Sequence, residues 1–595
     1  MRRDPHFGDL AHVASPRFQQ ALAKYQANHL DEAEALLRPL LRISPNDVNT
    51  LALLGTVLGD KGVPEQAEFF LRRALSLDPS NGMLWGTLGD VLSQQGRNTD
   101  AIDAFKRAVQ HWPDDARLHR ALCAALCDEG KPTEAITYGR RAVELAPDDP
   151  WTFNNLLGAL GAAGLTEQAI AAAEEGIRRH PRAGVLKQAA AFNLCYLANS
   201  DAAATASRQI ELGRQFSDLI ANDDTPFANT REPTRPLRIG LLSPDLRKHS
   251  VAYFLESFLP YIDRNQYTIY GYQCRSRDAN SAKLAAHCAQ FHTVDTITDS
   301  QINALVRSER IDILIDLAGH SSHTRLSAML RRCAPVQCTY IGYPATTGCR
   351  NIDYRIVDAI TDPPGAVADS HCSEKLVRLP RCFLCYMPPD APAPSCTPGR
   401  PVTFASLNTT QKLSAPSLAA WARLLARVPD SRLVIKTLSA SAPEVAARLK
   451  ATLADAGADL ARVEIRPFLR DFKAHLASYA EIDIALDPWP YNGTTTTCET
   501  LWMGVPVINL RGDNHVSRVG ESLLTAVGMA DLVASDVDRY IDTAARLAGD
   551  EPRRRHLRAS LRRQMSESDL CNGPSLARSL ETAWRRMWRT WCAAS

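Results

Sequence analysis

The chain has 595 residues, enough for several domains, and its 45% hydrophobic and 23% charged content is that of an ordinary globular protein. A formal net charge of +2 gives no large field of one sign, which argues against nucleic acid or an anionic membrane as a partner. The N-terminus has no apolar signal segment, and no run of about 18 apolar residues follows it. We therefore expect a cytoplasmic protein without a membrane span.

The first third of the chain repeats with a period of 34 residues. Three residue types keep this register: prolines at Pro45, Pro79, Pro113, Pro147 and Pro181; alanines at Ala33, Ala67, Ala101, Ala135 and Ala169; and turn glycines at Gly62, Gly96, Gly130 and Gly164, with Asn28 in this place in the first repeat. The alanine lets two helices approach closely, the glycine supplies a left-handed turn, and the proline ends the second helix. We predict five helix–turn–helix units over about residues 14–183, and this pattern resembles the tetratricopeptide repeat.

Such repeats stack into a curved solenoid whose concave face binds peptides or proteins. Protein acceptors are therefore the expected partners of residues 1–183, and a structural spacer or a homodimer contact is the alternative. Helical spacing continues from residue 184 to 222 and predicts a cap on the solenoid. A polar, proline-marked linker follows and ends at Pro236, so the cap and linker together span residues 184–236.

From Leu237 onward, short apolar runs alternate with segments of helix length. The predicted strands of a first half are Leu237–Ser243, Tyr267–Cys274, Ile311–Ala318, Val336–Tyr343 and Ile352–Ile360, and those of a second half are Val402–Leu407, Leu433–Leu438, Val463–Phe468, Ile482–Leu486 and Val505–Leu510. This alternation predicts parallel, doubly wound sheets that bind ligands at the carboxyl ends of their strands. We expect two Rossmann-like domains, residues 237–386 and 401–595, joined by a proline-rich hinge at 387–400.

The fifteen cysteines show no disulfide-framework spacing. A single Cys-x-x-Cys occurs, Cys382 to Cys385, but no second pair or His-x-His accompanies it. We therefore predict a buried strand at this motif rather than a zinc site.

Residues 486–504 are the most informative stretch of the chain. A strand-like run is broken by Pro488 and Pro490, turns at Asn492-Gly493, and enters a helix through four consecutive threonines. The first turn of a helix has unpaired N–H groups and the positive end of its dipole, and Thr494, Thr495 and Thr496 add hydroxyl donors. We call residues 492–497 the threonine turn and predict a nucleotide diphosphate there. Glu499, one turn further on, is placed to accept hydrogen bonds from a ribose diol; an ordinary capped helix is the alternative.

A tetratricopeptide array followed by two nucleotide-binding halves resembles the intracellular protein O-glycosyltransferases, which include the O-GlcNAc transferases and the plant SPINDLY-type enzymes. Besides the threonine turn, the likeness rests on residues 237–250, 333–337 and 341–348. It covers about residues 14–591 and implies the fold called GT-B, without the domain that animal members insert between the halves. It also implies an inverting transfer of a single sugar from a nucleotide sugar to Ser or Thr of proteins, with no metal or other cofactor.

The resemblance assigns roles to polar residues near the predicted strand ends. His249 matches a family histidine that has been considered as the base, and its ordinary pKa near neutrality suits that role. Asp245 is a second candidate for the base. Lys412 matches the lysine that contacts the diphosphate, where an ammonium stabilises the charge of the leaving group. Asn408 and Thr409 precede it and are expected to line the phosphate site.

Further residues are assigned to the donor sugar and the nucleoside. His475 matches a family histidine near the nucleoside, and the turn Gly342, Tyr343 and Pro344 resembles the wall of the family's sugar pocket. His320 follows another strand and is expected to face the cleft. The segment 512–515, which includes His515, and Arg518 are expected to close over the phosphates. No Asp-x-Asp stands at a strand end of the second half, which agrees with a reaction that needs no metal.

The donor is left open between two nucleotide sugars. Asp362-Pro-Pro364, residues 376–386 and the Thr-Thr-Thr-Thr-Cys-Glu run resemble the SPINDLY branch, which implies GDP-fucose, whereas many bacterial relatives are assigned UDP-GlcNAc by similarity. A non-catalytic tetratricopeptide scaffold and a nucleotide-sugar epimerase are alternatives from other classes. The presence of His249, Lys412 and Glu499 together argues against a degenerate site. An aromatic segment at Leu580–Trp591 is predicted to be a crossover helix that packs on the neighbouring domain.

Overall fold

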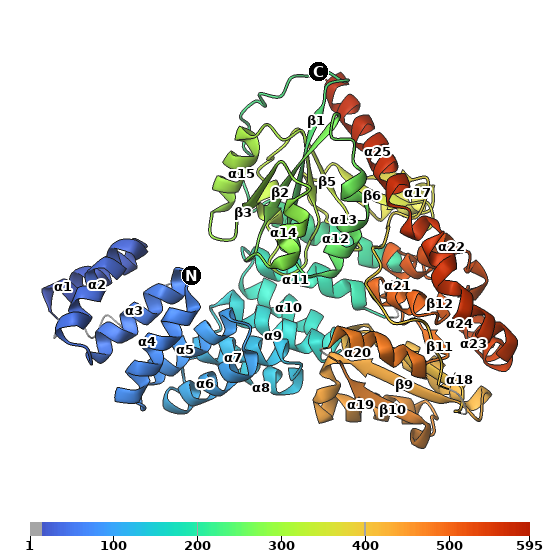
Figure 1. Cartoon of the computed structure of the whole chain (residues 1–595), viewed down its shortest axis with the longest axis horizontal. Coiled ribbons are helices and arrows are strands. Elements are labelled where there is room, and N and C mark those ends of the chain that lie inside the picture. Colours follow the sequence, from blue (N-terminus) through green and yellow to red (C-terminus); the bar gives the residue numbers. More distant parts are fainter. Residues whose placement is uncertain (1–14, 199, 398–399, 470, 595) are drawn as a thin grey trace. The chain divides into compact units, whose positions relative to one another are not determined.

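The computed structural model describes residues 15–198, 200–397, 400–469 and 471–594 (Figure 1). The predicted start of the first repeat at residue 14 and part of the predicted hinge, 398–399, lie outside the described residues. The chain forms two compact units, Met1–Ala162 and Ala163–Ser595. The predicted fifth repeat is present as the helices Pro150–Ala162 and Thr166–Arg179, and the division between the two units falls inside it. One physical reason is that Arg448 donates hydrogen bonds to the backbone oxygens of Ala163 and Gly164, within the second unit.

The first unit is a stack of antiparallel helix pairs. Its helices are α1 (Pro16–Gln26), α2 (Leu30–Ile43), α3 (Val48–Asp60), α4 (Pro64–Leu77), α5 (Gly82–Gln94), α6 (Asn98–His111), α7 (Ala116–Asp128), α8 (Pro132–Leu145) and α9 (Pro150–Ala162). The turn glycines Gly62, Gly96 and Gly130 have φ between 73° and 76°, and Asn28 has φ 68°, which confirms the predicted left-handed turns. The repeated alanines in α2, α4, α6 and α8 are 0% exposed, because only a small side chain fits between the paired helices.

Four helical elements open the second unit: α10 (Thr166–Arg179), α11 (Gly184–Asn193), the 3-10 helix η2 (Leu194–Tyr196) and α12 (Ala202–Ser217). We call residues 184–217 the cap. Phe216 of α12 lies in the apolar core that also contains Leu242 and Leu314 of the first sheet. The cap is therefore packed onto the first Rossmann-like domain.

The first sheet has seven parallel strands in the order β3-β2-β1-β4-β5-β6-β7. They are β1 (Leu237–Ser243), β2 (Tyr267–Gln273), β3 (Gln290–Thr293), β4 (Ile313–Asp316), β5 (Val336–Thr339), β6 (Tyr354–Asp358) and β7 (Lys375–Leu379). The helices of this domain are α13 (Ser250–Phe258), α14 (Ala279–Ala285), α15 (Asp299–Ser308), α16 (Leu326–Met329) and α17 (Ala366–Ser370). The five predicted strands are present, and the edge strands β3 and β7 are additional.

The second sheet has six parallel strands in the order β10-β9-β8-β11-β12-β13. They are β8 (Thr403–Ser406), β9 (Arg432–Thr437), β10 (Val463–Pro467), β11 (Ile484–Leu486), β12 (Val507–Leu510) and β13 (Val533–Ala534). Its main helices are α18 (Ala415–Arg427), α19 (Pro443–Asp455), α20 (Phe472–Ala477), α21 (Thr495–Trp502), α22 (Val519–Ala526), α23 (Val537–Gly549) and α24 (Glu551–Ser566). Both sheets thus have the doubly wound order that the sequence predicted.

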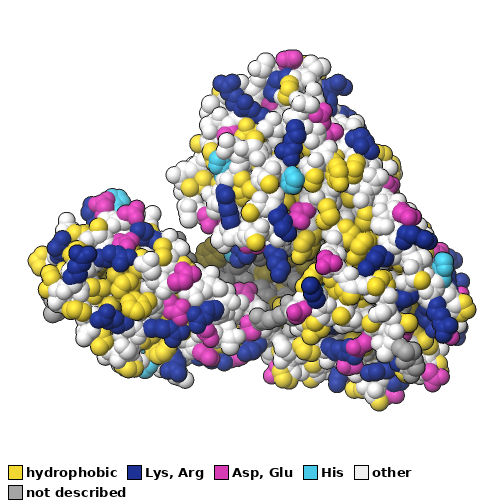
Figure 2. Space-filling view, viewed as in Figure 1, with side chains coloured by type: hydrophobic (Ala, Val, Ile, Leu, Met, Phe, Trp, Pro, Cys, Tyr) yellow, Lys and Arg dark blue, Asp and Glu magenta, His cyan; other side chains and the backbone are white. Residues whose placement is uncertain are grey.

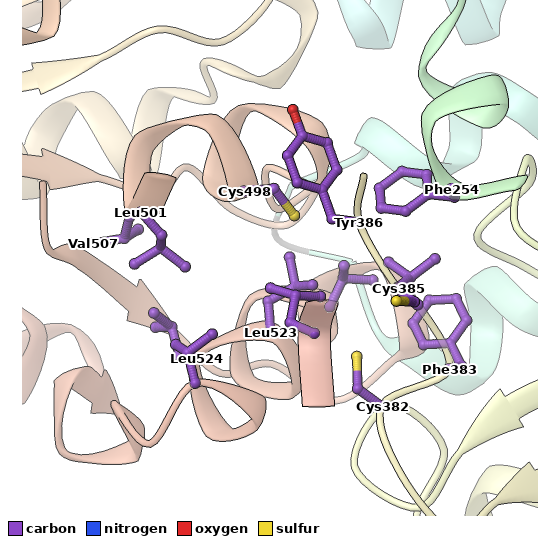
Figure 3. Packing of buried hydrophobic residues seen from close by; sticks show 14 of the residues in the cluster. Phe254, Cys382, Phe383, Cys385, Tyr386, Cys498, Leu501, Val507, Leu523 and Leu524 are labelled. Atoms are coloured by element: carbon purple, nitrogen blue, oxygen red, sulfur yellow. The ribbon is translucent and has the colours of Figure 1, made fainter. Parts of the chain in front are cut away.

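The Cys382–Cys385 motif lies in the core that joins the two sheets. Both cysteines are buried, but the segment is irregular, so the predicted strand is wrong. Figure 3 shows the segment from Cys382 to Tyr386 among residues of both domains, with Phe254 on one side and Cys498 on the other. The segment is irregular because the preceding strand, β7, has already ended at Leu379, and the chain here crosses from one sheet to the other.

The last helix, α25 (Gly573–Ala593), returns to the first domain, where it contacts α13, β5 and β7. Trp584, Met587 and Trp588 are buried on this side, and the Trp588 indole N–H donates to the backbone oxygen of Glu232. The predicted crossover helix is therefore present.

The formal net charge of the chain is only +2. On the face in Figure 2, Lys and Arg side chains are interspersed with Asp and Glu. Within the described ranges, no helix is both long and apolar enough to cross a bilayer. The same part of the chain holds no group of three or more His, Cys, Asp or Glu side chains arranged to bind a metal ion. All fifteen cysteines are free thiols.

Candidate active site

Polar loops gather at the point where the strand order of each sheet reverses. In the second domain, β8 pairs with β11, and the loops after these two strands hold Lys412 and the threonine turn. In the first domain, β1 pairs with β4, and the loop after β1 leads to His249. Open parallel sheets bind ligands at this switch point, because the loops of the two central strands diverge there and leave a crevice.

The threonine turn is held by a carboxylate that the sequence analysis did not single out. Asp487, 2% exposed, directly follows β11 and accepts hydrogen bonds from Gly493 N–H at 2.7 Å and from the Asn509 amide at 2.8 Å. A Cβ at Gly493 would lie 2.6 Å from Thr497 Oγ1, so only glycine fits this close turn. Burial raises the pKa of Asp487 to about 7, against the lowering effect of these hydrogen bonds and of Lys412.

The N-terminus of α21 is open. Thr494 is the N-cap residue, yet its side chain makes no capping hydrogen bond. Thr494, Thr495 and Thr496 are partly exposed, and in the described chain their hydroxyls have no hydrogen-bond partner. The first-turn N–H groups and these hydroxyls together form a cradle suited to an anion.

Lys412 ends a short 3-10 helix, η4 (Thr410–Lys412), directly beside this cradle. Its ammonium donates a hydrogen bond to the backbone oxygen of Asn492 at 2.8 Å and lies 4.1 Å from the centre of the Tyr491 ring. Burial lowers the pKa of Lys412 to about 8, and the Asp487 carboxylate opposes that shift. A cation therefore stands where the cradle would receive negative charge.

The two predicted phosphate-site residues before Lys412 differ in their surroundings. Asn408 is 6% exposed, its Nδ2 donates to Ser406 Oγ at 3.4 Å, and its buried Oδ1 has no partner. A Cβ on Gly493 would lie 3.4 Å from this oxygen, which places Asn408 against the threonine turn. Thr409 is exposed and stands at the N-cap position of η4, where its side chain makes no capping hydrogen bond.

His475 and Glu499 meet in a buried network that includes an unpredicted lysine. The Lys436 ammonium, at the end of β9, donates to His475 Nδ1 at 2.7 Å and to Ser478 Oγ at 2.8 Å. Because Nδ1 accepts this bond, His475 carries its proton on Nε2, which lies 3.3 Å from Glu499 Oε2. Burial lowers the pKa of Lys436 to about 8, and Glu499 opposes that shift. The network orients the Glu499 carboxylate.

His249 and Asp245 lie together at the start of α13. The two side chains are 3.6 Å apart, and His249 Nδ1 accepts a capping hydrogen bond from Val251 N–H at 3.3 Å. Burial lowers the pKa of His249 and raises that of Asp245, while each group's charge opposes the shift of the other. Tyr253 is one turn further along α13, and its pKa is raised by burial and by the Glu499 carboxylate. Tyr253 therefore lies on the side of α13 that is turned toward the second domain.

The predicted sugar-pocket turn is tight. Gly342 approaches β4 so closely that a Cβ would lie 1.8 Å from the Leu317 carbonyl oxygen. Pro344 is buried, and the Tyr343 side chain is directed into the cap, where its hydroxyl donates to Ala191 O at 3.2 Å. Tyr343 therefore contributes only its backbone to any sugar pocket.

One further expectation is corrected by the structure. His320 does not face the cleft: it is 3% exposed, lies between the Phe216 and Tyr343 rings, and pairs with Thr347 O at 2.7 Å. Its pKa is lowered by burial to about 4, so it serves as a neutral packing residue.

The segment around His515 joins the two domains and borders a cavity that Pro344 of the predicted sugar-pocket turn also lines. His515 Nδ1 donates to Asp362 Oδ2 at 2.6 Å, and both groups are 6% exposed. Arg518 donates to the backbone oxygens of Gly512 and Ile360. These side chains make contacts between the two domains, and they also line this cavity, so their role in closing over phosphates stays a prediction.

Asp487, Lys436 and Tyr491 are the residues that sequence reasoning did not single out. Two signals were available. Asp487 is the first polar residue after a buried strand, and Lys436 is a lone charge inside the apolar run of β9. Their partners are distant in sequence, so their roles follow only from the fold.

Doubly wound domains with an open helix N-terminus at a switch point are typical of nucleotide-binding proteins. The model for glycosyl transferase family 41 matches residues 194–386 and 395–580, more than half of the chain, so the chain belongs to this family. Tetratricopeptide-repeat models match residues 48–81 and 87–150.

The relatives fit this assignment. The chain is 41% identical over 382 residues to the Arabidopsis thaliana protein described as "Probable UDP-N-acetylglucosamine--peptide N-acetylglucosaminyltransferase SPINDLY", covering 62% of this chain and 41% of that protein. The chain is 26% identical over 373 residues to the Arabidopsis thaliana protein described as "Probable UDP-N-acetylglucosamine--peptide N-acetylglucosaminyltransferase SEC". This match covers 60% of this chain and 38% of that protein. The chain thus spans about two fifths of the length of these curated relatives.

One solved structure extends over nearly the whole fold. It is a mutant of the O-GlcNAc transferase of Thermobaculum terrenum, 33% identical, with a TM-score of 0.79 and coverage of 87% of this chain and 98% of that chain. This match and the repeat models confirm the predicted combination of a tetratricopeptide solenoid with a GT-B catalytic region.

Proposed function

We propose that this protein transfers one sugar from a nucleotide sugar to Ser or Thr hydroxyls of protein acceptors, with inversion and without a metal ion. The observation that carries the proposal is the position of Lys412 beside the open N-terminus of α21. Family membership supports glycosyl transfer, and the likeness to SPINDLY and to an O-GlcNAc transferase supports a protein acceptor.

In this reaction the acceptor oxygen attacks the anomeric carbon while the bond from that carbon to the diphosphate oxygen breaks. Attack from the face opposite the leaving group inverts the anomeric centre. Negative charge grows on the departing nucleoside diphosphate, and the Lys412 ammonium, the N–H groups of α21 and the threonine hydroxyls stabilise it. A cation and a set of donors supply the stabilisation for which other transferases use a divalent ion.

The acceptor proton passes to the His249–Asp245 pair. In the free protein, the Val251 N–H occupies the Nδ1 lone pair, so the neutral His249 ring carries its proton on Nε2. For His249 to act as the base, that proton must shift to Nδ1, where the Asp245 carboxylate 3.6 Å away can accept a hydrogen bond. Asp245, whose pKa is raised by burial, is the alternative base.

Two donors are candidates, GDP-fucose and UDP-GlcNAc. The Lys436–His475–Glu499 network would bind the nucleoside, with Glu499 accepting hydrogen bonds from the ribose. The repeats would recruit the protein acceptor and present an extended segment to the site. We place the reaction in the cytoplasm, because fifteen free thiols suit a reducing compartment.

Calorimetric titration with UDP, UDP-GlcNAc, GDP and GDP-fucose in the presence of EDTA tests this proposal. We expect one nucleotide and the corresponding nucleotide sugar to bind tightly and the other pair to bind weakly. Mass spectrometry should then find the sugar of the tightly bound donor on Ser or Thr of proteins incubated with the enzyme. The titrations are repeated without EDTA, and binding that appears only when EDTA is omitted would contradict metal independence. Failure of all four ligands to bind would favour the scaffold alternative.

A further inference from the structure

Three loops of the proposed donor site contact the same short stretch of the cap, residues 191–196, which we call the cap corner. The first is the sugar-pocket turn of the first domain, whose Tyr343 hydroxyl donates to Ala191 O at 3.2 Å. Tyr343 is 3% exposed and packs with Cys195 and Tyr196 in one small apolar cluster. The cap corner therefore holds the turn that leads to Pro344.

The second loop is the one that carries Lys412. Gln411, its neighbour, donates from Nε2 to Asn193 Oδ1 at 3.0 Å. Asn193 is 4% exposed, and its own Nδ2 donates to Ala189 O at 2.9 Å. Because both the Oδ1 and the Nδ2 atoms of Asn193 are hydrogen-bonded, the orientation of its amide is fixed. The bond from Gln411 to this amide therefore restrains the Lys412 loop.

The third loop enters the threonine turn. Tyr491, just before Asn492, stacks on Tyr196 with 4.6 Å between ring centres and 19° between their planes. The Lys412 ammonium lies 4.1 Å from the centre of the same Tyr491 ring. Tyr196 thus contacts the same Tyr491 ring that the Lys412 ammonium contacts. Tyr491 therefore connects the cap to Lys412.

We propose that the cap corner is a structural wall of the catalytic site, and that Tyr196 and Asn193 are positioning residues that act through Lys412. This inference rests on the proposed function of Lys412. The loops come from two separate sheets, so neither sheet alone sets their mutual geometry. The cap corner contacts all three loops and so fixes the position of the Lys412 ammonium relative to the cradle before the donor binds. Electrostatic stabilisation of a transition state requires such preorganisation.

The test uses the full-length protein and donor hydrolysis, so that no protein acceptor is needed. Tyr196→Ala should lower kcat by at least about tenfold with a smaller change in donor KM, because a small misplacement of a charged group weakens the transition state most. Tyr196→Phe keeps the stacked ring and should stay close to the wild type. Circular dichroism and thermal melting of both variants establish that they fold.

A double-mutant cycle shows whether Tyr196 acts through Lys412. In a Lys412→Ala background, Tyr196→Ala should cause little further loss, because the group that it positions is absent. Equal losses in both backgrounds, or an unchanged kcat for Tyr196→Ala alone, would overturn the proposal. If Lys412→Ala is too slow to be measured, the pH profile of kcat/KM for Tyr196→Ala is used in place of the cycle. Its alkaline limb should lie at a different pH from that of the wild type, because a displaced Lys412 ammonium has a different environment.

A second variant covers the case in which Tyr196→Ala does not fold. Asn193→Ala removes the acceptor of Gln411 and leaves the aromatic stack in place, so it should also lower kcat more than it changes KM. Wild-type kcat in Asn193→Ala would then overturn the proposal. Wild-type turnover in Lys412→Ala would be a different result, because it would remove the proposed function of Lys412 itself.

Discussion

The Lys412 ammonium lies 2.8 Å from the backbone oxygen of Asn492, the residue that opens the threonine turn. One loop therefore supplies the cation and the other supplies the donors, and a hydrogen bond between the loops holds them together. The two loops follow adjacent central strands, β8 and β11. The phosphate cradle is thus a consequence of strand order as much as of the threonines themselves.

Lys412→Ala should lower kcat by at least about 100-fold and change donor affinity much less, because the charge that the ammonium faces grows in the transition state. Steady-state kinetics and calorimetric affinity for the donor separate the two effects. A defect confined to affinity would contradict the role that we assign to Lys412.

The pH dependence should report the same group. Burial lowers the pKa of Lys412 to about 8, so the ammonium loses its proton as the pH rises through that value. We expect kcat/KM for the donor to fall on the alkaline side near pH 8, whereas in kcat the limb should lie higher, because the bound diphosphate favours the charged form.

Lys436 has a pKa lowered to about 8 as well and could produce the same limb. The profile of Lys436→Arg separates the two lysines, because arginine stays protonated across this range. A limb that persists in this variant belongs to Lys412, and a limb that disappears would reassign it to Lys436.

Much of this architecture could be predicted from residue patterns, because central strands are continuous apolar runs that end in polar loops. The strands that were missed, such as β3 with the sequence Gln-Phe-His-Thr, are short and lie at sheet edges; β3 has no fully buried residue, so it lacks the apolar run that marks a central strand. Cys382–Cys385 was predicted to be a buried strand because no second metal-ligand pair accompanies it; its burial comes instead from the contact between the two domains.

Within the site, motif likeness identified the groups that face the crevice but not those that hold them. His475 and Lys436 are 39 residues apart and meet only because α20 folds back over the end of β9. Conversely, His320 follows a strand end and is nevertheless buried, because the cap covers that side of the first sheet. A polar residue after a strand end is a candidate site residue. The packing of neighbouring elements decides whether its side chain faces the crevice.

Lys436→Met should weaken donor binding by about tenfold, the worth of about one charge-assisted hydrogen bond, and leave kcat less affected. Without the ammonium, His475 Nδ1 loses its donor, and the Nε2–H that faces Glu499 is no longer fixed. Calorimetry with the nucleoside diphosphate measures the change. Lys473→Met, an exposed lysine on α20, is the matched control and should bind as the wild type does. Equal losses in both variants would indicate a general charge effect.

His249→Ala should lower kcat by at least about 100-fold, the usual contribution of acid–base catalysis. The loss should be measured both with protein acceptors and as donor hydrolysis, since the base acts on the attacking oxygen in each case. Near-normal transfer by this variant would move the role to Asp245. Asp245→Asn, which keeps the size of the side chain and removes its charge, is then the decisive variant.

Removal of residues 1–162 should separate recruitment from chemistry, because the remaining chain, 163–595, is a compact unit that keeps the cap and both sheets. We expect this truncated protein to bind and hydrolyse the donor like the full chain and to lose at least about 100-fold in the modification of protein acceptors, since affinity spread along repeats is lost with them. Unchanged donor affinity shows that the site is intact. Full rates of protein modification would mean that the repeats serve another purpose, such as assembly with a second copy of the chain.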